Sequence, residues 1–187
     1  MAALAAVAVV ASTVATVKIS NDSKPKSDVG AAKPYVYKKG SIFPFAANCY
    51  AYAIGAEYNQ EPGRKSGRKP TDWSDVYDVG ASVEADLVSQ GYTVRTISGP
   101  NEKVYENEYK IALRVGTKPC GYNVFDGKVK YDYHFMVQTN TGQWAEKHGF
   151  GGESILWDAG MTPENIPWTA NGKPYYDSDI IYFAVGS

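Results

Sequence analysis

The chain has 187 residues, of which 44% are apolar and 21% are charged, and its formal net charge is -1. This length fits one domain with a substantial core. The near-neutral charge argues against a general nucleic-acid-binding protein and against a protein that binds anionic membranes, because both need a basic excess. Fifteen tyrosines and four tryptophans favour half-buried strands and an aromatic core.

The N-terminal part differs in composition from the rest. Residues 2–17 are Ala, Val, Leu, Ser and Thr, with no charge before Lys18. This run is shorter than the roughly 20 residues of a membrane-spanning helix, so no stable membrane span is expected. It is similar to the apolar core of a secretory signal, with Ala15 near a cleavage point, although a buried strand is the alternative. Residues 1–34 are therefore predicted to be a signal-like apolar segment and a polar linker, and the protein is expected to be secreted or cell-surface.

Residues 35–187 are predicted to form one domain that begins with two helices. The first helix, 48–58, has Asn48 as its N-cap and an Ala-rich interior interrupted by Gly55. The second helix is predicted over 74–90, where apolar residues recur at helical spacing before Gly91.

Strand patterns follow the helices. They cover 92–97, 109–115, 128–138, 143–147 and 179–185, with a hairpin turn at 139–142 and a Gly/Pro-rich loop over 154–174. Helices followed by an antiparallel run indicate an α+β fold, in which the helix that carries Cys49 packs on an antiparallel sheet.

Cys49 is the first candidate for chemistry. It is predicted to occupy the first helical position, where free backbone N–H groups and the helix dipole favour a negative charge. A thiolate there is expected to have a pKa below the usual value of about 8.5, and the Cys49 N–H could face an oxyanion. The alternative is a small buried apolar residue. Cys120, between Pro119 and Gly121, is predicted to be a structural residue in a turn.

Only two histidines, His134 and His148, can supply an imidazole base. In a strand, His134 shares a face with Asp132 and Met136. The hairpin returns the chain beside its start, so Glu146 is predicted to lie next to His134 and orient its ring. A solvated cross-strand charge is the alternative for Glu146.

Three segments together resemble bacterial papain-like cysteine peptidases and amidases: N-C-Y-A-Y-A at 48–53, D-Y-H-F at 132–135 and G-Q-W-A-E-K at 142–147. Members of that superfamily place Cys at a helix start, His on a following strand and a polar orienting residue on the next strand. The resemblance covers residues 41–149 and implies a papain-like fold. The sequence departs from the family at Glu146, where related sequences often carry His, so His148 is the alternative third residue. The family's Gln oxyanion donor is also absent, which leaves Asn48, Tyr37 or a backbone N–H for that role.

The resemblance and the residues together predict a thiol-dependent hydrolase that cleaves an amide bond of a peptide or of peptidoglycan. Cys49 is the nucleophile, His134 the base, Glu146 the orienting residue and Asn48 the oxyanion candidate. No cofactor or metal is required, and a monomer is expected.

Two other readings stay open. One is a secreted, non-catalytic binding domain with a Cys49–Cys120 disulfide. The other is a zinc site built from Cys49, His134 and His148, since three ligands and a water suffice for zinc.

Overall fold

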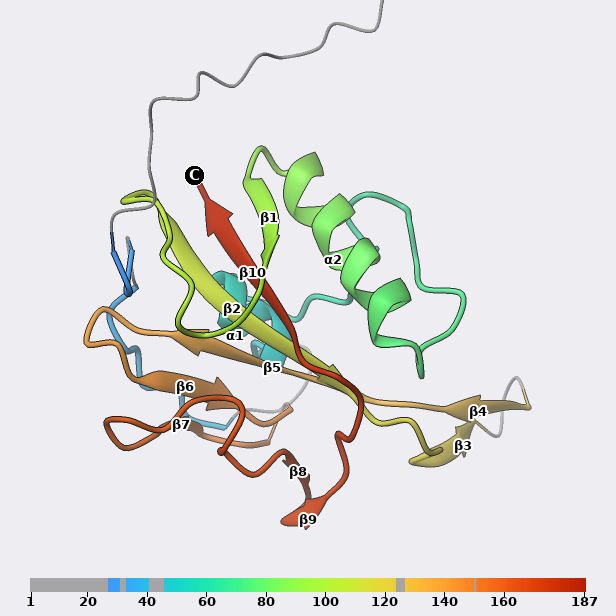
Figure 1. Ribbon diagram of the computed structural model, residues 1–187. Helices are drawn as coiled ribbons and strands as arrows, with labels where there is room; N and C mark the ends of the chain where they lie inside the picture. Colours follow the sequence, from blue (N-terminus) through green and yellow to red (C-terminus); the bar gives the residue numbers. More distant parts are fainter. Residues whose placement is uncertain (1–26, 31–32, 41–45, 124–126, 150) are drawn as a thin grey trace, which may run out of the picture.

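A six-stranded antiparallel sheet organises the protein (Figure 1). The computed structural model describes residues 27–30, 33–40, 46–123, 127–149 and 151–187. The strand order in the sheet is β1-β10-β2-β5-β6-β7. The bounds of these strands are β1 Thr93–Ile97, β2 Glu108–Val115, β5 Tyr133–Gln138, β6 Trp144–Lys147, β7 Ser154–Leu156 and β10 Ile181–Gly186. Two small sheets pair β3 Gly121–Asn123 with β4 Lys128–Lys130, and β8 Thr169–Ala170 with β9 Lys173–Pro174.

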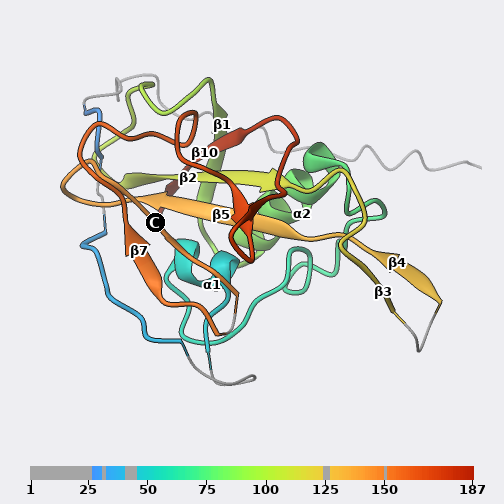
Figure 2. The same ribbon diagram turned by 90° about the horizontal axis from the view of Figure 1, so that it is seen from below.

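Two helices, α1 Cys49–Ile54 and α2 Val76–Ser89, cover one face of the sheet (Figure 2). Helix α1 packs on β5 and β6, whereas α2 packs on β1, β2 and β10. Side chains alternate across each strand, so Phe135 points into the core beneath the helices and Met136 into a second core on the opposite face. Loops that carry Trp168 and Tyr176 cover this second core.

Helix α1 is short because a capping residue defines each of its ends. The Asn48 side chain accepts a hydrogen bond from the Ala51 N–H at 3.0 Å, which is the predicted N-cap. Gly55 ends the helix with φ +76°, a left-handed conformation that glycine adopts without strain. A Cβ at this position would also lie 2.8 Å from Lys33 Nζ. The predicted helix over 48–58 is therefore confirmed at its start and ends earlier than expected.

Helix α2 follows the predicted helix over 74–90 closely. Its N-cap is Asp75, whose side chain accepts from the Tyr77 N–H at 2.9 Å. The apolar stripe includes Val79 and Val83, which are fully buried against the sheet. Val88 fits the same spacing but is 55% exposed, because it lies on the outer side of the helix.

The predicted single strand over 128–138 is wrong. The chain forms β4, leaves the ladder at 131–132 and then forms β5. The Asp132 carboxylate accepts a hydrogen bond from the Tyr133 N–H at 2.9 Å, and such a side-chain bond competes with ladder pairing. Strand β4 pairs with β3 outside the main sheet, so this ribbon projects sideways (Figure 1). The hairpin between β5 and β6 forms as predicted.

The fold is α+β, as predicted, with strands predominating. The predicted loop over 154–174 contains the short strand β7 and the whole β8–β9 hairpin. Within the described ranges, no helix is both long and apolar enough to cross a membrane. The signal-like segment and residues 21–26, 31 and 32 of the predicted linker lie outside the described residues.

Candidate active site

Cys49 and His134 line one cavity of about 460 Å³, called here the Cys49 cavity. It lies where α1 begins and where the chain passes from β4 to β5. Polar and aromatic side chains surround it: Asn48, Asn59, Glu61, Cys120, Lys130, Tyr131, Asp132, Tyr133 and Tyr176, with Gly149. The cavity therefore combines two thiols, an imidazole and two carboxylates in one space.

Cys49 is the first residue of α1, as predicted, but its surroundings oppose a thiolate. Its side chain is buried, and Sγ donates to the Tyr133 carbonyl at 3.5 Å. Burial raises the pKa of the Cys49 thiol, and the nearby Asp132 carboxylate raises it further. The prediction of a lowered pKa is therefore wrong, because loss of solvent outweighs the terminus of a six-residue helix. The resting group is a neutral thiol that needs a base.

His134 supplies the candidate base, and Glu146 holds it as predicted. Glu146 lies opposite Met136 in the β5–β6 register, which puts its side chain on the same face as His134. His134 Nε2 lies 2.7 Å from Glu146 Oε2, and both side chains are 1% exposed. Since Nε2 donates to the carboxylate, the lone pair of His134 is left on Nδ1. The alternative of a solvated Glu146 is excluded by this burial.

His148 contacts the same carboxylate from the other side. Its Nε2 lies 3.3 Å from Glu146 Oε1, which also accepts from Trp157 Nε1 at 3.1 Å. Burial alone would raise the pKa of Glu146, but the hydrogen bonds from His134 and His148 and their charges lower it to about 2. The contact with Glu146 raises the pKa of His148. Glu146 is thus an anion held by three donors, and His148 adds to its role as orienting residue rather than replacing it.

Aromatic rings fix the plane of the His134 imidazole. The His148 ring stacks on it with centroids 4.6 Å apart, and the Tyr176 ring stacks with centroids 5.2 Å apart. Trp168 meets it edge-on at 6.0 Å. Trp157, Trp168 and Tyr176 were not predicted as site residues. They come from the loop-rich segment after β6, and no local pattern in the sequence connects them to His134.

The two histidines and Glu146 also form the one group of potential metal ligands within the described residues, with ligand atoms within 4.8 Å of one another. The His134 and His148 rings are 15° from parallel. The lone pair of an imidazole nitrogen lies in the ring plane, so two stacked rings cannot both point at one zinc ion about 2.0–2.1 Å away. This arrangement does not favour the predicted zinc site of Cys49, His134 and His148.

The Asn48 side chain is occupied by structural hydrogen bonds and has no free donor for an oxyanion. Its amide nitrogen donates to the Gln60 carbonyl at 2.7 Å and to the Tyr133 hydroxyl at 3.3 Å, so both amide hydrogens have partners. Tyr37 is 55% exposed and does not line the Cys49 cavity. The remaining candidate is the backbone N–H of Cys49, which at the first helical position has no partner inside the helix.

Cys49 and Cys120 are both free thiols, so the disulfide of the binding-domain alternative is not formed. Cys120 is exposed and donates from Sγ to the Lys130 carbonyl at 3.4 Å. It lines the Cys49 cavity from the β3 side, whereas a structural residue in a turn was predicted.

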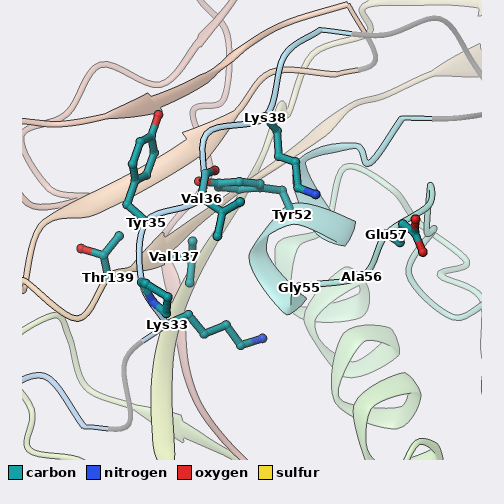
Figure 3. A pocket seen from close by; sticks show the side chains of 11 residues that line it. Lys33, Tyr35, Val36, Lys38, Tyr52, Gly55, Ala56, Glu57, Val137 and Thr139 are labelled. Atoms are coloured by element: carbon teal, nitrogen blue, oxygen red, sulfur yellow. The ribbon is translucent and has the colours of Figure 1, made fainter.

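A second cavity, of about 210 Å³, lies at the opposite end of α1 (Figure 3). Its lining includes Lys33, Tyr35, Lys38, Tyr52 and Glu57, and neither cysteine nor histidine reaches it. Burial lowers the pKa of Lys33 to about 8. Its ammonium group donates to the Ile54 carbonyl at 2.7 Å, so this lysine helps to close the C-terminal end of α1.

Comparisons of the chain with protein-family models, with curated proteins and with solved structures gave no match. The function must therefore be inferred from the site itself. The structure brings together His134, Glu146 and His148, and it places Cys49 in the same cavity as His134. The Cys49 sulfur is directed to the Tyr133 carbonyl in this arrangement, and the predicted approach of Sγ to within about 4 Å of a His134 nitrogen remains a prediction.

Proposed function

We propose that this protein is a papain-like, thiol-dependent hydrolase of amide bonds in peptides or peptidoglycan. The observation that carries the proposal is the shared cavity of Cys49 and His134, with the imidazole fixed by a buried carboxylate. A nucleophile, a base and a residue that orients the base are the three parts of this chemistry. A purely structural His134–Glu146 pair would not need a thiol at the same opening.

The reaction proceeds through an acyl-enzyme. The Cys49 thiol turns from the Tyr133 carbonyl toward His134, and Nδ1 accepts its proton as sulfur attacks the substrate carbonyl. The backbone N–H of Cys49 donates to the developing oxyanion. The imidazolium then protonates the leaving amine, and water, activated by the same imidazole, releases the acyl group. Glu146 stabilises the imidazolium throughout. An amine in place of water would give acyl transfer.

The direct test is the reactivity of Cys49 toward iodoacetamide at pH 8, followed by peptide mass spectrometry, with Cys120 as the internal reference. The thiol pKa is raised, so Cys49 needs His134 as base to react at this pH. His134→Ala is expected to slow the labelling of Cys49 about 100-fold, the scale of general-base catalysis, and to leave Cys120 unchanged. The rate should rise with pH from 6 upward, because the thiolate is scarce at pH 6.

His148→Ala is the matched control, since it removes the other histidine without removing the base. Its effect on Cys49 labelling should be much smaller than that of His134→Ala, because His134 keeps its hydrogen bond to Glu146. Equal labelling of Cys49 in the wild type and in His134→Ala would contradict the proposal, as would a Cys49 that does not react at all.

Export is a separate part of the proposal, and it rests on the apolar run over 2–17. The mature protein is expected to be secreted or cell-surface and to lack about 15 to 30 N-terminal residues. Intact-mass measurement on protein from its native host checks this. A full-length mass would exclude cleavage.

A further inference from the structure

Asp132 is a hydrogen-bonded carboxylate on the wall of the Cys49 cavity. It stands where the chain passes from β4 to β5, two residues before His134. It lines the Cys49 cavity and also a neighbouring cavity of about 610 Å³ whose lining includes His148 and Thr169. Asp132 thus lies on the wall between the two cavities, together with Gly149 and Tyr176, so a substrate that occupies both lies beside its side chain.

Two neutral donors hold this carboxylate in place. The Tyr133 N–H donates to Oδ1 at 2.9 Å, and the Tyr176 hydroxyl donates to Oδ2 at 2.8 Å. Among the described residues, none of the ion pairs includes Asp132. A carboxylate offers about four acceptor sites, so these two bonds orient it and leave capacity for a further donor.

The charge of Asp132 acts against the nucleophile. Together with burial, it raises the pKa of the Cys49 thiol, because a negative sulfur beside a carboxylate is disfavoured. A cation placed against Asp132 would cancel this repulsion at the moment when the thiol gives up its proton. A cationic group of the substrate would supply this counter-charge, in addition to the weaker one that His148 provides.

We propose that Asp132 is a specificity-determining residue that binds an ammonium or guanidinium group of the substrate close to the scissile amide. The inference rests on the proposed hydrolase function. It narrows the substrate class to amides that carry a free amine or a basic side chain next to the bond to be cleaved. Binding such a substrate aligns it with Cys49 and removes a charge that opposes thiolate formation.

Two small thiol reagents of opposite charge test this without a known substrate. The cationic 2-aminoethyl and the anionic 2-sulfonatoethyl methanethiosulfonate each form a disulfide with a thiolate and release methanesulfinate. Cys120→Ser leaves Cys49 as the only thiol of the chain. The ratio of the cationic to the anionic rate, measured by intact mass at pH 8, is expected to fall about tenfold in Asp132→Asn. Comparing ratios cancels the intrinsic reactivities of the two reagents.

Glu61→Gln is the matched control, because Glu61 is the other carboxylate that lines the Cys49 cavity and is not among the groups that shift the pKa of the Cys49 thiol. Its ratio should change less than about twofold, since Glu61 is exposed and its charge is screened by solvent and salt. The Asp132→Asn side chain keeps an oxygen acceptor, and thermal unfolding shows whether this variant is folded. If Asp132→Asn does not fold, the test uses the chain with Asp132 in place. A higher salt concentration must then lower the ratio of the cationic to the anionic rate.

The outcomes separate the two proposals. If Cys49 reacts but Asp132→Asn leaves the rate ratio unchanged, the proposed role of Asp132 is wrong and the proposed hydrolase function is not affected. The same conclusion follows if Asp132→Asn does not fold and the wild-type ratio does not depend on salt. A Cys49 that reacts with neither reagent overturns both.

Discussion

Glu146→Ala is expected to lower the free energy of unfolding by about 3 to 5 kcal/mol, the usual cost of removing one partner from a buried charged network. The Glu146 carboxylate is 1% exposed and accepts from His134, His148 and Trp157. Alanine leaves these three donors without an acceptor and opens a cavity between β5 and the segment after β7. Urea unfolding at pH 7, followed by circular dichroism, measures the loss.

Glu146→Gln separates the catalytic contribution of this residue from its structural one. Glutamine keeps the shape and one acceptor oxygen, so the variant should be folded. Its amide oxygen and nitrogen cannot serve all three donors, and an amide N–H facing His134 would move the ring proton to Nδ1, where the base is needed. Iodoacetamide labelling of Cys49 at pH 8 should fall about 100-fold or more. Labelling at the wild-type rate in a folded Glu146→Gln would show that Glu146 only supports the fold.

The pKa of Glu146 also determines how its contribution to stability depends on pH. Its pKa is lowered from 4.5 to about 2 in the folded state, so its contribution is fully present above pH 4.5 and is lost as the pH falls toward 2. The shift corresponds to about 3 kcal/mol. His148, whose pKa is raised, contributes below its unfolded value and loses that contribution as the pH rises through its folded value. Unfolding free energies measured from pH 2 to pH 5 should show a smaller acid loss in Glu146→Gln than in the wild type, because the variant keeps only the contributions of other carboxyl groups with lowered pKa, such as Asp78.

The contact between His134 and Glu146 could be predicted from the sequence because it is local. The two-residue period of a strand and the turn over 139–142 together fix which side chains share a face. The Asn48 cap was predictable for the same reason, since it is read from adjacent residues. The papain-like reading of these features stays a proposal.

The surroundings of the site could not be predicted, because they come from distant parts of the chain. Trp157 and Tyr176 reach Glu146 and His134 from loops beyond β6, and loops carry no periodic pattern. The burial of Cys49 likewise depends on how α1 settles against β5 and β6. The position of the thiol is therefore predicted correctly from local sequence, and the direction of its pKa shift wrongly.

Asp86 holds the loop that carries Glu61, which lines the Cys49 cavity, and Trp73, which packs on Tyr133. It lies in α2, is 1% exposed, and accepts hydrogen bonds from the backbone N–H groups of Gly63, Lys65 and Ser66 and from the Ser66 hydroxyl, at 2.7 to 2.9 Å. Further along the same loop, Trp73 stacks on Tyr133 with centroids 5.6 Å apart. One carboxylate thus connects the second helix to a wall of the site.

Asp86→Ala is expected to lower the free energy of unfolding by about 3 kcal/mol, because Asp86 is itself buried and its loss leaves four donors without their acceptor, one of them the N–H of buried Gly63. Asp78 is the matched comparison. It also accepts from loop residues, including Thr71 and Asp72, but these are exposed, so Asp78→Ala should cost about 1 kcal/mol. Urea unfolding of both variants tests the order. A larger loss of unfolding free energy in Asp78→Ala than in Asp86→Ala would contradict the prediction that the buried carboxylate contributes more to stability.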